Sequence, residues 1–259
     1  KSKTCDNFYL CIWCNMINQI FNEDCLEWMK RIPDQSIDCI ITDPPYWTTA
    51  CKWDSVIPFD KMWEQLKRII KPNGAIVLFG SEPFSSALRM SNIKMYKYDW
   101  VWEKSRKTGF QMARKRPMKE HENIIVFYEK QPTFNQDLIK LDKPINSWRK
   151  NGKGGNLLNE VKTAKERKQE YTGFYTTIIR IKNEHNIGKH PTQKPVALIE
   201  YLIKTYTNEW ETVLDFTMGS GTTAIACINT NRNYIGFELD KWYFDIANER
   251  IAWKLQNKE

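Results

Sequence analysis

Short apolar runs alternate with amphipathic segments in the first and last parts of the chain. Apolar residues at helical spacing predict helices over residues 26–32, 59–70, 195–205, 224–229 and 241–254. Apolar runs bounded by turn-forming residues predict strands over 37–41, 75–79, 101–102, 124–128, 213–215 and 234–238. The first run, Ile37-Asp38-Cys39-Ile40-Ile41, is nearly continuous, as is typical of parallel strands buried on both faces. Strands in alternation with helices predict an α/β fold with a doubly wound, mostly parallel sheet.

This regular pattern is lost between residues 131 and 189. The stretch contains Asn-Gly-Lys-Gly-Gly at 151–155, few long apolar runs, and a lysine-rich segment over 160–170 that we expect to be helical. We therefore expect residues 1–130 and 190–259 to form two halves of one core, with 131–189 as an inserted module. The apolar stretch from Phe8 to Phe21 is too short and too polar to span a bilayer, so we expect no membrane association.

The net charge of +8 is unevenly distributed along the chain. Residues 130–189 contain 13 basic and 6 acidic residues, and residues 103–120 contain 7 and 2, so the remainder is net acidic. Positive charge concentrated in two neighbouring segments is expected where those segments neutralise nucleic-acid phosphates. The alternative is a lysine-rich surface that faces only solvent.

The cysteine content argues against a disulfide framework. Seven cysteines are an odd number, which favours reduced thiols and a cytoplasmic location. Cys11 and Cys14 form a C-x-x-C pair, but a structural zinc site needs a second ligand pair at similar spacing. The three histidines, at 121, 185 and 190, are scattered, and we expect no metal site.

A glycine turn near the C-terminus has the position of a cofactor site. Gly219 and Gly221 lie between the strand that ends at Asp215 and the next helix, where backbone N–H groups can bind an anion. The turn lacks the Gly-Lys-Ser/Thr of a phosphate-binding loop, and Ala224 replaces the third glycine of a dinucleotide fingerprint. A carboxylate is therefore the expected anion. Glu238, about twenty residues on at the end of the next strand, can accept hydrogen bonds from both hydroxyls of a ribose.

The candidate chemical site is Asp43-Pro44-Pro45-Tyr46, which directly follows a buried strand. Open α/β sheets bind their ligands at the carboxyl ends of their strands. Asp43 and the Pro44 carbonyl could accept the two N–H bonds of an exocyclic amine, whose lone pair could then attack a sulfonium methyl group. Tyr46 offers a flat face on which a flipped base could stack. The alternative is that this tetrapeptide is only a capped turn.

With these motifs the sequence resembles the adenine-N6/cytosine-N4 amino-group DNA methyltransferases, whose catalytic motif is (Asp/Asn/Ser)-Pro-Pro-(Tyr/Phe/Trp) and whose cofactor motif contains Phe-x-Gly-x-Gly. The catalytic motif comes first here, as in the permuted β class. The resemblance implies a Rossmann-like core, S-adenosylmethionine as cofactor and a target-recognition region at 131–189. It also implies that 190–195, with Lys194, closes over the methionine end of the cofactor, and that Met218 stands where a small residue is common. The implied catalytic residues are Asp43, Pro44, Pro45 and Tyr46, and the implied cofactor-binding residues are Asp24, Lys194, Asp215, Phe216, Gly219, Ser220, Gly221, Thr222 and Glu238.

The resemblance implies a site-specific enzyme that methylates N6 of adenine in double-stranded DNA, because Asp at the first motif position is more typical of adenine enzymes. Cytosine N4 remains the alternative target. An RNA or small-molecule methyltransferase, or an inactive DNA-binding module on the same fold, also stays open. Cytosine-C5 methylation is disfavoured because its cysteine nucleophile usually follows proline and no Pro-Cys occurs. Two further partners stay open: a second copy of the chain in a homodimer, and a restriction endonuclease counterpart.

Overall fold

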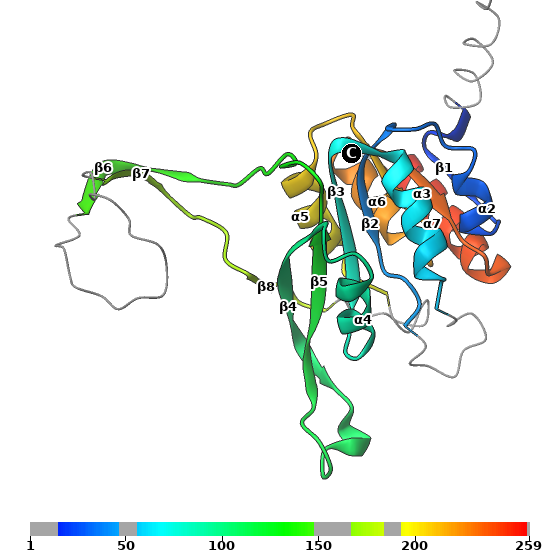
Figure 1. Ribbon diagram of the computed structural model, residues 1–259, viewed down its shortest axis with the longest axis horizontal. Coiled ribbons are helices and arrows are strands. Elements are labelled where there is room, and N and C mark those ends of the chain that lie inside the picture. Colours follow the sequence, from blue (N-terminus) through cyan, green and yellow to red (C-terminus); the bar gives the residue numbers. More distant parts are fainter. Residues whose placement is uncertain (1–14, 47–55, 148–166, 184–192, 258–259) are drawn as a thin grey trace, which may run out of the picture. The chain divides into compact units, whose positions relative to one another are not determined.

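The computed structural model describes residues 15–46, 56–147, 167–183 and 193–257. The chain divides into two units, residues 1–135 with 177–259 and residues 136–176. The larger unit contains an eight-stranded sheet in the order β1-β10-β9-β2-β3-β5-β4-β8 (Figure 1). Its strands are β1 (Gln19–Phe21), β2 (Ile37–Thr42), β3 (Ile70–Gly80), β4 (Tyr96–Thr108), β5 (Lys119–Phe127), β8 (Ile178–Arg180), β9 (Thr212–Asp215) and β10 (Asn233–Phe237).

The five strands from β1 to β3 pair in parallel. Their register places apolar residues side by side, with Ile40 next to Leu214 and Ile41 next to Val77, all fully buried. Such strands need cover on both faces, which helices supply. The helices are α2 (Cys25–Met29), α3 (Phe59–Ile69), α4 (Phe84–Ser91), α5 (Val196–Tyr206), α6 (Thr222–Asn229) and α7 (Lys241–Gln256). The predicted doubly wound α/β fold is thereby confirmed.

The sheet reverses its direction of winding between β9 and β2. From β9 the chain crosses through α6 to β10, and from β2 it crosses through α3 to β3, on the other side. Right-handed crossovers that run in opposite directions place α6 and α3 on opposite faces of the sheet. The carboxyl ends of β9 and β2 therefore flank a topological switch point, the place where open α/β sheets bind ligands.

Beyond β3 the sheet continues with a long antiparallel hairpin. β5 pairs with β3, β4 pairs with β5, and a 3-10 turn, η1 (Phe110–Met112), lies between β4 and β5. β8 adds in parallel to the outer edge of β4. Figure 1 shows this hairpin extending well past the neighbouring strands.

Two local expectations need correction. The helix predicted over 59–70 is present but ends at Ile69, and the strand predicted over 75–79 begins earlier, at Ile70. Pairing of Ile70 with Ile37 and the 2.5 Å ion pair between Lys71 and Asp38 extend the strand there. In the segment expected to be helical over 160–170, residues 167–170 are part of a strand, β7 (Arg167–Thr172), and residues 160–166 lie outside the described ranges. Antiparallel pairing of β7 with β6 (Ile139–Ser147) outweighs the helical propensity of the lysine-rich sequence.

The second unit is narrower than the insertion expected over 131–189. It spans residues 136–176 and contains the two-stranded sheet β6-β7. Residues 131–135 belong to the larger unit, where the backbone N–H of Asn135 donates to the Thr205 carbonyl at 2.8 Å. Residues 177–183 belong to it as well, because β8 pairs with β4. Across the described ranges, no helix combines the length and apolarity needed to cross a membrane.

Candidate active site

The candidate catalytic segment begins where β2 ends at the switch point. Thr42, the last residue of β2, is buried, and its hydroxyl donates to Asp215 Oδ1 at 3.0 Å and accepts the Phe216 N–H at 3.1 Å. The Thr217 hydroxyl donates to the backbone carbonyl of Asp43 at 3.0 Å. The loop after β9 is therefore hydrogen-bonded to the segment after β2. These bonds fix the predicted catalytic segment next to the predicted cofactor site.

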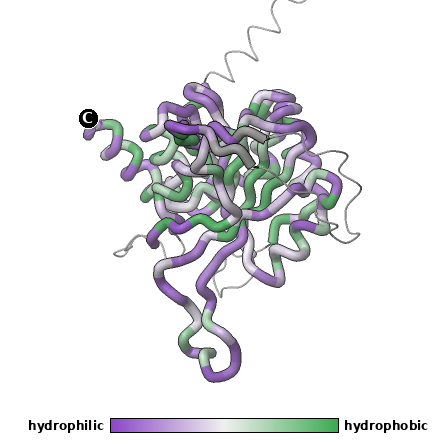
Figure 2. Tube along the Cα trace, turned by 90° about the vertical axis from the view of Figure 1, so that its left-hand side faces the viewer, coloured by the Kyte–Doolittle hydropathy of each residue, from purple (hydrophilic) through white to green (hydrophobic). Residues whose placement is uncertain are grey.

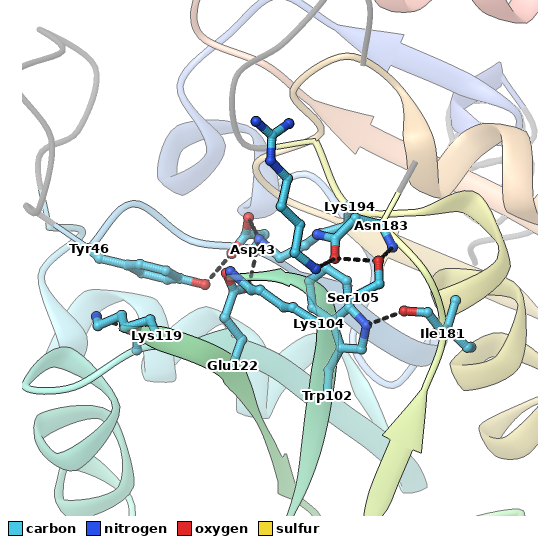
Figure 3. A network of polar contacts seen from close by, with 12 residues as sticks. Asp43, Tyr46, Trp102, Lys104, Ser105, Lys119, Glu122, Ile181, Asn183 and Lys194 are labelled. Carbon is cyan, nitrogen blue, oxygen red and sulfur yellow. Dashed lines mark hydrogen bonds and ion pairs between the residues drawn. The ribbon is translucent and has the colours of Figure 1, made fainter. Parts of the chain in front are cut away.

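Asp43 is held by a donor on each carboxylate oxygen. The Tyr46 hydroxyl donates to Oδ1, and the Lys194 ammonium donates to Oδ2 (Figure 3). Lys194 also lies 3.3 Å from Glu122 Oε2, and the ammonium of Lys104 pairs with Glu122 Oε1. The Lys194 side chain is buried and that of Asp43 keeps 26% of its surface exposed. The carboxylate of Asp43 is thus oriented from inside and open on one side.

Opposite charges alternate through this cluster from Asp43 to Lys104. Burial raises the pKa of Asp43, and Lys194 opposes that rise. Burial would lower the pKa of Lys194, but Asp43 and Glu122 outweigh it and raise that pKa. Burial likewise opposes the ionised form of Glu122, yet Lys194 and Lys104 together lower its pKa. Two carboxylates and two ammonium groups neutralise one another, which is what permits four charges in so little water.

The ring of Tyr46, at the end of the candidate catalytic segment, packs against α4. This ring stacks on Phe84 of α4 with centroids 5.0 Å apart and planes inclined by 30°. Phe84 is buried and contacts Phe59 at the start of α3. This packing fixes one face of the Tyr46 ring and directs its hydroxyl at Asp43.

The candidate cofactor region lies at the ends of β9 and β10. Glu238, directly after β10, accepts the Gly219 N–H on Oε2 at 2.7 Å and the Asp240 N–H on Oε1 at 2.8 Å. Burial raises the pKa of Glu238. Gly219 and Gly221 have φ of 56° and 83°, in the left-handed region that favours glycine. A Cβ on Gly221 would lie 3.0 Å from the Cβ of Ala247 in α7. Glycine at this position therefore also avoids a close contact with α7.

The residues around this turn hold one another in place. Arg250 of α7 donates to Ser220 Oγ at 2.9 Å, and that hydroxyl donates to Gln193 Oε1 at 3.0 Å. Thr222 is buried at the first position of α6, which has no side-chain cap. The N–H groups that begin α6 therefore stay available to an anion.

Met218 differs from the family pattern, and β10 compensates for it. A Cβ built on Gly236 would lie 2.3 Å from the Met218 Cε. The long Met218 side chain thus fills space that any other residue at 236 would occupy.

Three predicted cofactor residues have structural partners of their own. Asp215 accepts the Thr223 hydroxyl at 2.5 Å and the Thr217 N–H at 3.1 Å, besides the bond from Thr42. Phe216 is buried in the hydrophobic core. Asp24 is exposed and caps α2 by accepting the N–H groups of residues 26 and 27.

The loop that carries Asp24 nevertheless reaches the cofactor region. Asn22 donates to the Glu238 backbone carbonyl at 2.8 Å, and the Glu238 N–H donates to the Phe21 carbonyl at 3.0 Å. Lys194 pairs with Asp43, and its predicted contact with the cofactor stays a prediction. Residues 190–192 of its motif lie outside the described ranges, as do Cys11 and Cys14.

Sequence reasoning missed Glu122 and Lys104. They lie on β5 and β4, and only the pairing of Trp102 with Glu122 and Glu103 with His121 brings both charges to the root of the hairpin. The sequence signal that could have indicated Glu122 is its position close before the apolar run 124–127. Within the described ranges no group of His, Cys, Asp and Glu could hold a metal ion.

A family model described as DNA methylase, of the N6/N4 methyltransferase type, matches residues 37–249. The chain belongs to this family of DNA methylases. Residue 37 is the first of β2 and residue 249 lies in α7, so the match includes the candidate catalytic segment, the glycine turn and Glu238. The predicted membership in the amino-group methyltransferases is confirmed.

Several curated and solved proteins are similar to this DNA methylase. The type II methyltransferase M.HpaI of Haemophilus parainfluenzae is 29% identical over 251 residues, which cover 91% of this chain and 74% of that protein. M1.MboII of Moraxella bovis is 28% identical over 263 residues, covering 90% and 95%. The crystal structure of the M1.HpyAVI–SAM complex matches with a TM-score of 0.60 and 26% identity, covering 90% and 98%. The cytosine-N4-specific PvuII DNA methyltransferase, with a TM-score of 0.65 and 16% identity over 93% of both chains, shares the fold.

The buried carboxyl group of Asp215 predicts a pH dependence of stability. Burial raises its pKa to about 6, well above that of an unfolded aspartate. A raised folded-state pKa gives stability that is present at low pH and is lost as the pH rises through 6. Between pH 5 and 8 the wild type should lose roughly 1–2 kcal/mol relative to Asp215→Asn, as measured by urea unfolding. Asp60→Asn, at an exposed position, controls for charge removal. A stability difference between wild type and Asp215→Asn that stays constant with pH would contradict this prediction.

Proposed function

We propose that this DNA methylase transfers a methyl group from S-adenosylmethionine to N6 of adenine in double-stranded DNA, at a base flipped out of the duplex. The observation that carries the proposal is the position of Asp43-Pro44-Pro45-Tyr46 at the end of β2, beside the glycine turn and Glu238 at the ends of β9 and β10. An acceptor for an amine and an acceptor for ribose hydroxyls thus lie on the same edge of one sheet.

The residues of the cofactor region fit S-adenosylmethionine. Glu238 uses one lone pair on each oxygen for backbone N–H groups, and a carboxylate has about four acceptor positions, so two remain for the hydroxyls of a ribose. The uncapped start of α6 suits the carboxylate of the methionine end. When bound, S-adenosylmethionine supplies a methyl group on positively charged sulfur.

Asp43 would act on the target amine. An exocyclic amino group is a poor nucleophile because its lone pair is delocalised into the ring. Asp43 and the Pro44 carbonyl accept its two N–H bonds and favour a tetrahedral nitrogen with a free lone pair. Within the described structure Tyr46 and Lys194 use one lone pair on each Asp43 oxygen, which leaves acceptor positions for an amine.

The choice of adenine rests on Asp43, since Asp at this position is more typical of the adenine enzymes in the family that the chain resembles. The fold alone does not select the base, because the cytosine-N4-specific PvuII enzyme shares it. The basic segments support nucleic acid over a small-molecule substrate. A homodimer and a restriction endonuclease counterpart remain predictions.

Product analysis tests the proposed function directly. Purified protein, S-adenosylmethionine and unmethylated bacterial DNA are incubated, and the DNA is digested to nucleosides for mass spectrometry. We expect N6-methyladenine. N4-methylcytosine as the sole product would overturn the adenine assignment, and methylation of RNA but not DNA would overturn the substrate.

Asp43→Ala should lower the rate of methyl transfer by about 30- to 1,000-fold, because it removes a charged acceptor whose bond strengthens in the transition state. Cofactor affinity should stay close to that of the wild type, since Asp43 does not contact the glycine turn through its side chain. Asp245→Ala removes an exposed carboxylate from α7 and should retain full activity. A variant at residue 43 with more than about a tenth of wild-type turnover would contradict the assigned role.

Glu238→Ala should weaken S-adenosylmethionine binding by at least about tenfold, because each hydrogen bond to a charged acceptor contributes about 1.5–3 kcal/mol. Titration calorimetry without DNA measures this loss independently of catalysis. Glu249→Ala, an exposed substitution in α7, is the matched control. Equal affinities of wild type and Glu238→Ala would show that the ribose does not bind at the end of β10.

A further inference from the structure

The hairpin of β4 and β5 carries an ordered, exposed apex. Its legs pair from Tyr96 with Phe127 out to Thr108 with Lys119. Gly109 turns the chain with φ of 87°, and the Met112 and Ala113 N–H groups donate to the carbonyls of residues 109 and 110 at 3.0 Å. Figure 2 shows this hairpin leaving the body of the molecule with hydrophilic legs and hydrophobic positions near its tip. The apex is thus a built turn held out in solvent.

Positive charge covers this apex. Its exposed basic residues are Arg106, Lys107, Arg114, Lys115, Arg116 and Lys119. Glu120 pairs with Lys107 at 3.3 Å, and Lys119 donates to the Ser81 hydroxyl at 2.7 Å. Within the described part of the chain, the three consecutive cations 114–116 form no ion pair. Such uncompensated charge beside a long turn favours a polyanionic partner.

An aromatic side chain occupies the centre of the charged turn. Phe110 is 80% exposed, and Met112, two residues on, is 38% exposed. A single exposed apolar residue is common, but an aromatic ring next to three unpaired cations matches the two chemistries of nucleic acid, phosphate outside and flat bases inside. A bilayer is the weaker match, since one aromatic residue provides little apolar area for insertion.

The root of the hairpin is part of the candidate active site. Lys104 and Glu122, on its two legs, form the charge cluster that ends at Asp43. The Trp102 indole donates to the Ile181 carbonyl at 2.8 Å, which fixes β4 to the segment after β8. At about 3.3 Å per residue, the strand from Lys104 to Thr108 carries the apex roughly 13 Å away from this root.

We propose that this hairpin is a DNA-binding arm: Arg114, Lys115 and Arg116 neutralise backbone phosphates of the duplex away from the target base, and Phe110 packs against the bases. The inference rests on the proposed function for its choice of duplex DNA. It assigns to β4 and β5 a contact besides the target recognition predicted for residues 131–189. Phosphate contacts supply affinity without sequence information, while the ring acts on base stacking.

Two hairpin variants test the arm, with matched controls elsewhere on the surface. Arg114→Ala/Lys115→Ala/Arg116→Ala is compared with Lys61→Ala/Lys67→Ala/Lys94→Ala, which removes the same charge from other exposed positions. Phe110→Ala is compared with Trp253→Ala, an exposed aromatic residue of α7. Binding of a fluorescein-labelled duplex is followed by anisotropy from 50 to 300 mM salt, and urea unfolding verifies that each variant folds.

The two hairpin variants should lose duplex affinity with different salt dependences. The triple variant should lower duplex affinity at least about tenfold and reduce the slope of log affinity against log salt by about two to three. Phe110→Ala should lower affinity by about 5- to 150-fold and leave that slope unchanged, because it removes stacking rather than phosphate contacts. The two control variants should bind as the wild type does.

Further outcomes separate the DNA-binding arm from the proposed function, because either one can fail while the other stands. Hairpin variants that bind duplex as the wild type does would overturn the arm, even if the wild type methylates DNA. Equal losses in the hairpin and control triple variants would reduce the effect to net charge and would also overturn it. Phe110-dependent binding to phosphatidylserine vesicles but not to duplex would assign the apex to membranes instead. A wild type that binds duplex through the hairpin but transfers no methyl group would leave the arm standing and remove the proposed function.

Discussion

The hydrogen bond from Thr42 to Asp215 lies where the sheet reverses its winding, between β2 and β9. It joins the last residue of β2 to the last residue of β9 inside the core, and the Asp215 carboxyl also accepts a donor from α6. Because the loops after both strands leave from this point, their spacing fixes how far Asp43 lies from the glycine turn. A carboxyl buried this deeply is costly when ionised, so its three hydrogen-bond donors are needed to hold it there.

The charge cluster around Asp43 shows how a carboxylate with little contact with solvent can be held in one orientation. Lys194 satisfies two acids at once, and Lys104 satisfies the second of them. Removal of one partner from a buried ion pair typically costs about 3–5 kcal/mol, because the other charge stays buried and uncompensated. The four side chains therefore behave as a unit, and the orientation of Asp43, which follows β2, depends on residues from β4, from β5 and from the segment before α5. Tyr46, stacked on Phe84, adds a second constraint from α4.

Sequence reasoning was most successful where local spacing decides the position of a residue in the fold. The position of Asp43 after a buried strand, and of Glu238 one α/β unit after the glycine turn, follows from strand ends that meet at one edge of a parallel sheet. It failed where long-range pairing decides the outcome. Residues 167–170 form a strand because β6 pairs with them, and Glu122 meets Lys104 only through the register of β4 and β5. The resemblance implied a cofactor contact for Lys194, which stays a prediction, but it gave no signal for the ion pairs of Lys194 with Asp43 and Glu122, residues 151 and 72 positions earlier in the chain.

The hairpin of β4 and β5 reaches into solvent at its apex, and at its root it supplies two members of the charge cluster, Lys104 and Glu122. Lys104 and Glu122 cannot move apart without exposing an unpaired buried charge, so the root of the hairpin is held to Lys194 by electrostatics as well as by strand pairing. The apex is joined through β4 and β5 to two residues of the cluster that orients Asp43. If the apex binds DNA as proposed, that contact and the partners of Asp43 lie on the same pair of strands. Substrate binding and orientation of the catalytic carboxylate would then share one element of the sheet.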